Sequence, residues 1–255
     1  KQKQVTVSSE QVWNKPWPVI QLNYKNITKA YFKAIPYDYT KLMESSRYNI
    51  INRYINRDLF NELKELEAIE KWNTDLPNTS DYHERSAYVN VPTNLKPGFY
   101  FIMVSHHESF QNDNNNITVA KVWVSDLALI TRRSHIKGEL SGFVLKALDG
   151  KPVPQAQVKL YEANNQGYFK KAKTIETDQN GMFLFKSTSK KSRYQNHLLL
   201  AQKGLHKISN INSIYLYQPN PYQKSEQTVF FTDRSIYRPG QTIQFKGICS
   251  HTDKD

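Results

Sequence analysis

The feature that most constrains the fold of this chain is a series of short strand-like segments separated by turn residues. The turn Leu95–Gly98, which contains a Pro-Gly pair, separates the segment Ala87–Val91 from the continuous apolar run Phe99–Val104. Asp149-Gly150 and Asn180-Gly181 divide later segments in the same way, and Asn-Gly suits a backbone with positive φ. Short strands with turns at this spacing are typical of β-sandwiches, so the sequence predicts a mainly β protein.

The length of 255 residues predicts more than one domain. Cores stop growing near the size at which chains split into units of about 100 to 150 residues. The two prolines within Pro219–Pro221 cannot join a sheet ladder and indicate a linker. We expect a first sandwich over residues 1–135, a second over 136–218, and a linker with part of a third over 219–255. Each complete sandwich is expected to have its own core.

Two segments near the start of the chain alternate apolar and polar residues. Val19–Tyr24 and Ala30–Ile35 are separated by the turn-like pair Lys25-Asn26. This period and punctuation predict that the two segments pair as a β-hairpin.

The spacing of apolar residues changes from two to three or four between about residues 41 and 73. This pattern predicts one or two amphipathic helices, inserted into the first sandwich and packed against it by one face. That face consists of Ile51, Ile55, Leu59, Leu63, Leu66 and Ile69.

The charge balance narrows the range of partners. The chain has 35 Lys and Arg against 23 Asp and Glu, a formal charge of +12, but the basic residues are scattered and lack an aromatic stacking platform. We therefore expect no nucleic-acid partner.

No apolar run is long enough to span a bilayer, so we expect no membrane contact by this segment. An export signal or lipid-anchor cysteine would lie upstream of Lys1.

Adjacent polar residues at the end of one strand could suggest a metal or hydrolase site. His106-His107-Glu108 and Ser109 carry the right atoms. Neighbouring histidines on a strand point to opposite faces, however, and Ser109 lacks a Gly-rich nucleophile elbow. We predict surface histidines here.

The single cysteine and three turn residues complete the chemical candidates. Cys249-Ser250-His251-Thr252 lacks the Cys-x-Glu-Gln pattern of a thioester, which predicts a strand thiol. Asp149, Asp178 and Asn180 offer oxygen ligands for Ca²⁺, but no loop has EF-hand spacing, so turn stabilisation is favoured. The sequence thus predicts no catalytic, cofactor-binding or metal-binding residue and no cofactor, and the chain is not expected to be an enzyme.

Three groups of segments resemble one protein family. Phe231–Ile243 resembles the signature that opens a macroglobulin module in bacterial alpha-2-macroglobulin-like proteins. Ser141–Val158, followed by Thr177–Phe183, is similar to the preceding macroglobulin module. An earlier module is resembled upstream by Leu22–Ile27, Leu95–Tyr100 and Val124–Ile130.

The resemblance implies a fold of tandem immunoglobulin-like macroglobulin β-sandwiches, the first with a helical insertion. Full-length members capture proteases: cleavage of a bait segment triggers closure, and many members carry a thioester. The expected function is therefore a structural module segment of a bacterial endopeptidase inhibitor. Its partners would be neighbouring macroglobulin domains, with proteases as targets of the full-length protein. The expected location is exported, in the periplasm or at the cell surface, with a possible lipid anchor upstream.

A cell-surface adhesin or glycan-binding or protein-binding β-sandwich is the alternative. It would be favoured by a solvent-exposed cluster of the tryptophans Trp13, Trp17, Trp72 and Trp123.

Overall fold

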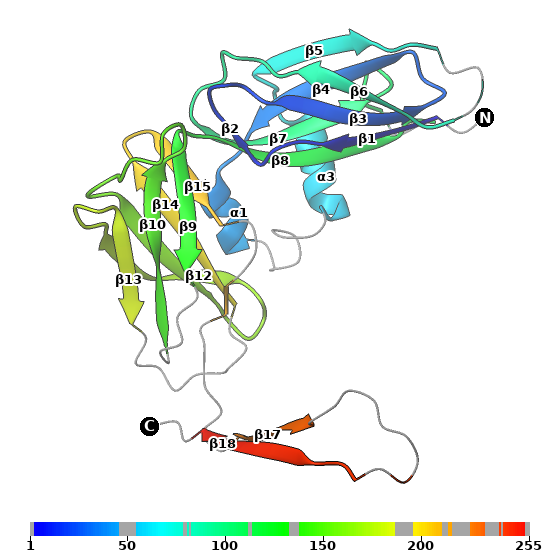
Figure 1. Cartoon of the computed structure of the whole chain (residues 1–255). Helices are drawn as coiled ribbons and strands as arrows, with labels where there is room; N and C mark the ends of the chain where they lie inside the picture. Colours follow the sequence, from blue (N-terminus) through cyan, green and yellow to red (C-terminus); the bar gives the residue numbers. More distant parts are fainter. Residues whose placement is uncertain are drawn as a thin grey trace. The chain divides into compact units, whose positions relative to one another are not determined.

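The computed structural model contains two compact units, Lys1–Tyr217 and Gln218–Asp255 (Figure 1). It describes residues 3–45, 55–78, 81, 83–111, 114–132, 138–186, 196–210, 214–215, 225–232, 240 and 242–252. Strands dominate both units, so the prediction of a mainly β protein built from sandwiches is confirmed.

The first module of the larger unit consists of two sheets. The smaller sheet has the order β1-β3-β6, with β1 at Gln4–Ser8, β3 at Val19–Lys25 and β6 at Arg85–Asn90. The larger sheet has the order β2-β8-β7-β4-β5. Its strands are β2 (Val12–Trp13), β8 (Ile117–Val124), β7 (Gly98–Ser105), β4 (Lys29–Pro36) and β5 (Glu70–Asp75). All neighbours are antiparallel except β2, which runs parallel to β8.

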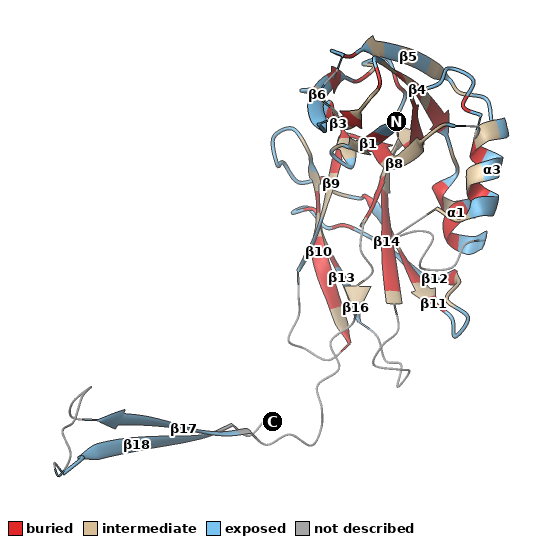
Figure 2. Cartoon of the chain, turned by 90° about the vertical axis from the view of Figure 1, so that its right-hand side faces the viewer, coloured by how far each residue is buried: buried red, intermediate tan, exposed pale blue. Residues whose placement is uncertain are grey.

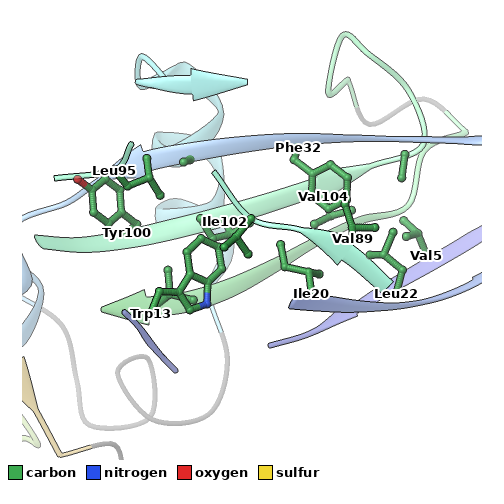
Figure 3. Close-up of a cluster of buried hydrophobic side chains, with 14 of the residues drawn as sticks. Val5, Trp13, Ile20, Leu22, Phe32, Val89, Leu95, Tyr100, Ile102 and Val104 are labelled. Atoms are coloured by element: carbon green, nitrogen blue, oxygen red, sulfur yellow. The ribbon is translucent and has the colours of Figure 1, made fainter. Parts of the chain in front are cut away.

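Strand β7 is apolar on both faces because it lies inside the larger sheet with packed layers on either side. Tyr100, Ile102 and Val104 point between the two sheets, where they meet residues such as Ile20 and Leu22 (Figure 3). Side chains alternate along a strand, so Phe99, Phe101 and Met103 belong to the opposite face. A continuous apolar run is what a strand buried on both faces requires.

The predicted hairpin between the third and fourth strands is wrong. β3 pairs with β1 and β6, whereas β4 pairs with β5 and β7, so the two strands lie in opposite sheets. Asn26 has a φ of 55°, and the buried Ile27 follows it, so the chain turns through the core from one sheet to the other. Both strands alternate because both line the same core from opposite sides.

The predicted helical insertion is present, but it is shorter than expected. Helix α1 spans Tyr39–Ser45 and α3 spans Arg57–Glu65. The side chain of Asn56 accepts a hydrogen bond from the Leu59 N–H at 3.0 Å, which caps α3 at its start. Leu59 and Leu63 are buried as predicted, whereas Leu66 is 37% exposed. Ile51 lies outside the described residues.

The last part of the predicted helix is a strand instead. Leu66 has an extended backbone, and the N–H of Ile69 donates to Ala34 O at 3.0 Å, which starts the pairing of β5 with β4. Trp72 then stacks on Phe32 with ring centroids 5.0 Å apart. Sheet pairing and this stacking therefore override the helical spacing of Leu66 and Ile69.

The second module is a sandwich of a three-stranded sheet, β13-β10-β9, and a sheet of order β12-β11-β14-β15 with β16 beside β14. The first sheet contains β9 (Leu127–Arg132), β10 (Glu139–Lys146) and β13 (Met182–Lys186). The second contains β11 (Gln157–Ala163), β12 (Phe169–Glu176), β14 (Asn196–Lys203), β15 (His206–Ser209) and β16 (Ile214–Tyr215). Buried Leu, Val and Phe side chains from both sheets form one core between them.

Strand β9 pairs with β10, from Leu127 opposite Lys146 to Arg132 opposite Ser141. The sequence predicts that this segment closes the first sandwich, with the boundary near residue 135. Its hydrogen bonds instead attach it to the second module, which places the change of module between β8 and β9.

The smaller unit contains β17 (Ser225–Thr232) and β18 (Phe245–Thr252), paired antiparallel. Its apolar side chains are exposed, among them Val229, Phe230, Phe231, Phe245 and Ile248 (Figure 2). Residues 233–239 of the macroglobulin-like signature lie outside the described residues.

Candidate functional site: the interface between the two modules

The outer face of the larger sheet is covered by the two helices. Phe99, Phe101 and Met103 of β7 form one apolar cluster with buried side chains of α1 and α3. The helical members are Tyr39, Leu42, Met43, Leu59 and Leu63. The Tyr37 hydroxyl donates to Glu62 Oε1 at 3.0 Å and connects α3 to the end of β4; burial and this carboxylate raise the pKa of Tyr37 to about 12.

The same cluster continues into the second module. Tyr161, Ala163, Phe169, Leu198 and Leu200 belong to it, and all five are buried. The expectation of a separate core for each sandwich is therefore incomplete. Each sandwich has its own interior, and a third apolar cluster joins them; we call this third cluster the inter-module cluster.

Strand β14 has the same two-faced character as β7 (Figure 2). Leu199 and Ala201 point into the core of the second module, while Leu198 and Leu200 point into the inter-module cluster. The period of two places these two pairs on opposite faces. The run Leu198–Ala201 in the sequence was a signal for this arrangement, because a strand with one wet face would alternate with polar residues.

Aromatic rings pack at the centre of the inter-module cluster. Tyr39 meets Phe99 and Trp123 with ring centroids 4.8 Å away in each case. Burial raises the pKa of Tyr39 to about 12, while a hydrogen bond with Ser209 of β15 opposes this shift. The phenol thus stays neutral at physiological pH and connects α1 to the second module.

Polar contacts hold the short connection between β8 and β9. The N–H of Ser125 donates to Trp13 O at 3.2 Å, and the amide of Asn14 donates to Ser125 O at 3.4 Å. The N–H of Asp126 donates to His206 Nδ1 at 3.1 Å, and its carboxylate lies 3.5 Å from His206 Nε2. The connection is therefore bonded to both modules.

A cavity of about 570 Å³ lies beside the interface. Strand β8 contributes Ile117–Lys121, the end of β1 contributes Val7 and Ser8, and the second module contributes Ser209 and Asn210. Burial lowers the pKa of Lys121 to about 8, since the charged ammonium loses hydration there. A cavity of this size is within the range of peptide and small-molecule sites.

The strand-end histidines make contacts within their own loop. His106 Nε2 lies 3.0 Å from Asn114 O, and His107 Nδ1 lies 2.8 Å from Ser109 Oγ. These contacts are local and order the loop; burial also lowers the pKa of His106. Within the described ranges, no three His, Cys, Asp or Glu residues are grouped as metal ligands would be.

The oxygen-bearing turns stabilise themselves, as predicted. Asp178 Oδ1 accepts hydrogen bonds from the N–H groups of Asn180 at 2.9 Å and Met182 at 2.8 Å. Asp149 Oδ1 accepts the N–H of Lys151 at 3.1 Å, and the neighbouring ammonium lowers the pKa of Asp149. Cys249 lies in β18, as predicted for a strand thiol, and is exposed beside the Thr228 hydroxyl at 3.3 Å.

The tryptophans give no support to the adhesin alternative. Trp13 and Trp123 are buried, and Trp17 and Trp72 are half-buried against the core of the first module. These four residues therefore do not form an exposed aromatic platform. No helix in the described ranges is long and apolar enough to cross a membrane.

Solved structures of bacterial alpha-2-macroglobulins are similar to this chain. Native alpha-2-macroglobulin from Escherichia coli spanning domains NIE-MG1 matches with a TM-score of 0.60 and 16% identity, over 82% of this chain and 96% of that one. The longer segment spanning MG0-NIE-MG1 matches with a TM-score of 0.59 and 15% identity, over 85% of this chain and 65% of that one. A Salmonella alpha-2-macroglobulin variant matches with a TM-score of 0.55 and 16% identity, over 98% and 15%.

The likeness to this chain comes from solved structures alone. No protein-family model matches the chain, and no curated protein matches it. The chain spans nearly all of the NIE-MG1 structure but only 15% of the Salmonella protein. At such identities the likeness concerns the fold, and there it confirms the resemblance noted from the sequence. The chain has the tandem-domain fold found in this part of bacterial alpha-2-macroglobulins.

Proposed function

We propose that this chain is a structural segment of a bacterial alpha-2-macroglobulin-like protease inhibitor and has no catalytic role of its own. The observation that carries the proposal is the match to the NIE-MG1 structure, which extends over 96% of that two-domain segment. The likeness therefore includes the succession of two domains and is not restricted to one common sandwich.

The inter-module cluster supports a scaffold role. Buried residues from β7, α1, α3, β11 and β14 form one apolar body, and the connection at Ser125 and Asp126 is bonded on both sides. Inter-domain motion is the default unless the interface is large and hydrophobic, as it is here. A segment of this kind holds two modules in a fixed relation.

The smaller unit supports a continuation of the module series. Two strands alone are marginally stable in water, and β17 and β18 expose Phe230, Phe231 and Phe245. We propose that these strands belong to a third macroglobulin sandwich whose remaining strands cover them.

The partners and location follow from the same proposal. Neighbouring macroglobulin domains would contact this segment, proteases would be the targets of the full-length protein, and the protein would be exported to the periplasm or cell surface. Neither nucleic acid nor a membrane is proposed as a partner of this segment.

The full-length protein should be tested as a protease trap. It is mixed with trypsin, and remaining trypsin activity is measured on a small chromogenic peptide and on a large protein substrate. A trap protects the large substrate while activity on the small one persists. Loss of both activities, or of neither, would contradict the proposed role in trapping.

The 255-residue chain is the control in the same assay. It should protect neither substrate and should take up no methylamine, because Cys249 lacks the thioester pattern. A stable complex of this chain with trypsin would instead place the inhibitory site within these modules.

A further inference from the structure

The three-stranded sheet of β13, β10 and β9 in the second module (Figure 1) has apolar residues on both faces. Phe143 of β10 pairs with Ile130 on one side and Met182 on the other, so these three side chains lie in one row. Their chain neighbours Val144 and Phe183 point into the core of the module, which places the row on the outer face. We call the apolar residues of this face the outer patch: Ala128, Ile130, Phe143, Leu145, Met182 and Leu184.

The outer patch is not covered by the described part of the chain. Ile130 is 49% exposed and Leu184 is 37% exposed. None of the apolar clusters that the described residues form contains a member of the patch. An antiparallel sheet with one wet face normally carries polar side chains there, whereas a contiguous exposed apolar surface marks an interaction site.

Strands β7 and β14 show how the same pattern is satisfied elsewhere in this protein. Each is apolar on both faces, and in each the second face is covered by the inter-module cluster. The strands β9, β10 and β13 have the same two-faced character. Their outer face therefore fits a partner that is separate from the two modules.

The size of the outer patch distinguishes between two kinds of partner. Three strands about 4.8 Å apart, with six residues at about 3.4 Å each, cover roughly 300 Å², so docking would bury about 600 Å² in total. Stable complexes of separate proteins bury at least about 1,200 Å², whereas domains of one chain are held by about 600 to 1,500 Å². A covalent tether makes the smaller area sufficient, because it raises the effective concentration of the partner. The area therefore favours a tethered domain over a second copy of the chain.

We propose that the outer patch docks against an apolar surface of a further domain of the parent protein. This inference rests on the proposed function, in which the chain is one segment of a longer inhibitor. The similar Escherichia coli structure that spans MG0-NIE-MG1 includes one domain beyond the two-domain NIE-MG1 segment. The exposed Arg132 lies at one end of the face, opposite Ser141, so the partner is expected to bring a carboxylate to that end.

Hydroxyl-radical footprinting tests whether the patch is covered. The 255-residue chain and the full-length protein receive the same radical dose, and the modification of Met182 and Leu184 is measured by mass spectrometry. We expect both residues to react at least about fivefold more slowly in the full-length protein, because the centre of an interface excludes water. Equal rates in the two proteins would overturn the proposal.

Ile130→Lys tests whether the patch itself makes the contact, with Tyr88→Lys as its matched control. Both residues are exposed on the outer face of a sheet, and Tyr88 lies on β6 of the first module. In the full-length protein, Ile130→Lys should bring the reactivity of Met182 to within about twofold of that in the 255-residue chain, because an apolar interface does not accommodate an unpaired charge. Tyr88→Lys should leave Met182 protected. Protection of Met182 in both variants, or in neither, would overturn the proposal.

Circular dichroism of the 255-residue variants shows whether each substitution leaves the fold intact. Ile130→Thr keeps a β-branched side chain in β9 and replaces Ile130→Lys in the same assay if the lysine variant does not fold. Continued protection of Met182 in a folded Ile130→Thr variant that carries Leu184→Thr as well would count against the docking surface.

Sedimentation distinguishes the tethered domain from a second copy. The 255-residue chain should keep Met182 reactive at micromolar concentration, and a dimer with a protected Met182 would overturn the tethered partner. The trypsin assay is read separately. If the full-length protein traps trypsin but Met182 is equally reactive in both proteins, the docking fails alone. If Met182 is protected but trypsin is not trapped, the proposed trapping function fails alone.

Discussion

Replacing Gly181 by alanine should destabilise the protein more than the same change at Gly150. Both glycines have a positive φ, +70° and +69°, so a side chain strains the backbone at either position. Their surroundings differ. A Cβ at Gly150 meets no atom within 4 Å, whereas a Cβ at Gly181 lies 2.5 Å from Val144 O and 3.1 Å from Val153 N. The pair therefore separates backbone strain from steric conflict.

The expected magnitudes follow from these contacts. Alanine at positive φ costs about 1 kcal/mol, which is the full expected effect of Gly150→Ala. At Gly181, a backbone oxygen at 2.5 Å forces the turn to move, and the hydrogen bond from Val144 N to Gly181 O, now 2.8 Å, is weakened. Such overpacking adds about 1 to 3 kcal/mol, so Gly181→Ala should cost about 2 to 4 kcal/mol in total.

Urea unfolding followed by two signals provides the assay. Circular dichroism reports the whole chain, whereas all four tryptophans lie in the first module. Because the inter-module cluster joins the modules, both signals should shift together in Gly181→Ala. Equal costs for the two glycine variants would refute the steric argument. A shift in circular dichroism without one in fluorescence would show that the modules unfold separately.

Two further variants examine the inter-module cluster. Leu200→Ala should lower the free energy of unfolding by about 2 to 5 kcal/mol, because it leaves a cavity at a buried site. Leu205 is exposed, so Leu205→Ala should change this free energy by less than about 0.5 kcal/mol. Similar urea midpoints for the two variants would contradict the burial of Leu200 in the inter-module cluster. The pKa of Tyr39 is raised to about 12, above the value of about 10 in an unfolded chain, so the neutral phenol stabilises the fold fully below pH 10. This contribution, roughly 2 to 3 kcal/mol, is lost as the pH rises from 10 to 12. Tyr39→Phe has no phenol to ionise at this position, so it should lose less stability over that interval. If urea unfolding showed the same fall in stability with pH for both proteins, the raised pKa of Tyr39 would be contradicted.

The elements of the first module could largely be predicted from the sequence, but their partners could not. The alternation in Val19–Tyr24 and Ala30–Ile35 correctly indicates strands with one buried face. The same alternation arises whether two strands share a sheet or face each other across a core. The turn at Asn26, with its positive φ, carries the chain from one sheet to the other. The same turn residues could also join two paired strands, so the choice between the two arrangements depends on tertiary packing.

The end of the helical insertion was mispredicted for a related reason. Leu66 and Ile69 continue the helical spacing of Leu59 and Leu63, so local pattern favours a longer helix. The chain leaves the helix at Leu66 because Ala34 and Phe32 of β4 offer a hydrogen bond and a ring to stack on. Both partners are more than 30 residues away in the sequence, beyond any local period.

The interface could have been suspected from two apolar runs. Phe99–Val104 and Leu198–Ala201 lack the polar alternation of a half-exposed strand, so each needs a covered second face. The two runs alone do not show that these strands belong to the same cluster, since apolar packing is not directional. The cavity at β8 was not predictable, because it depends on how far β2 extends along the edge.

The connection between β8 and β9 determines where a larger protein containing this segment is able to bend. β8 ends at Val124 and β9 begins at Leu127, so two residues join the modules, and their backbone groups are bonded to Trp13, Asn14 and His206. A hinge needs residues that absorb large changes in φ and ψ without losing contacts. This junction offers no such slack. The two modules would therefore move together as one rigid body. A conformational change in the parent protein would have its hinges at other connections.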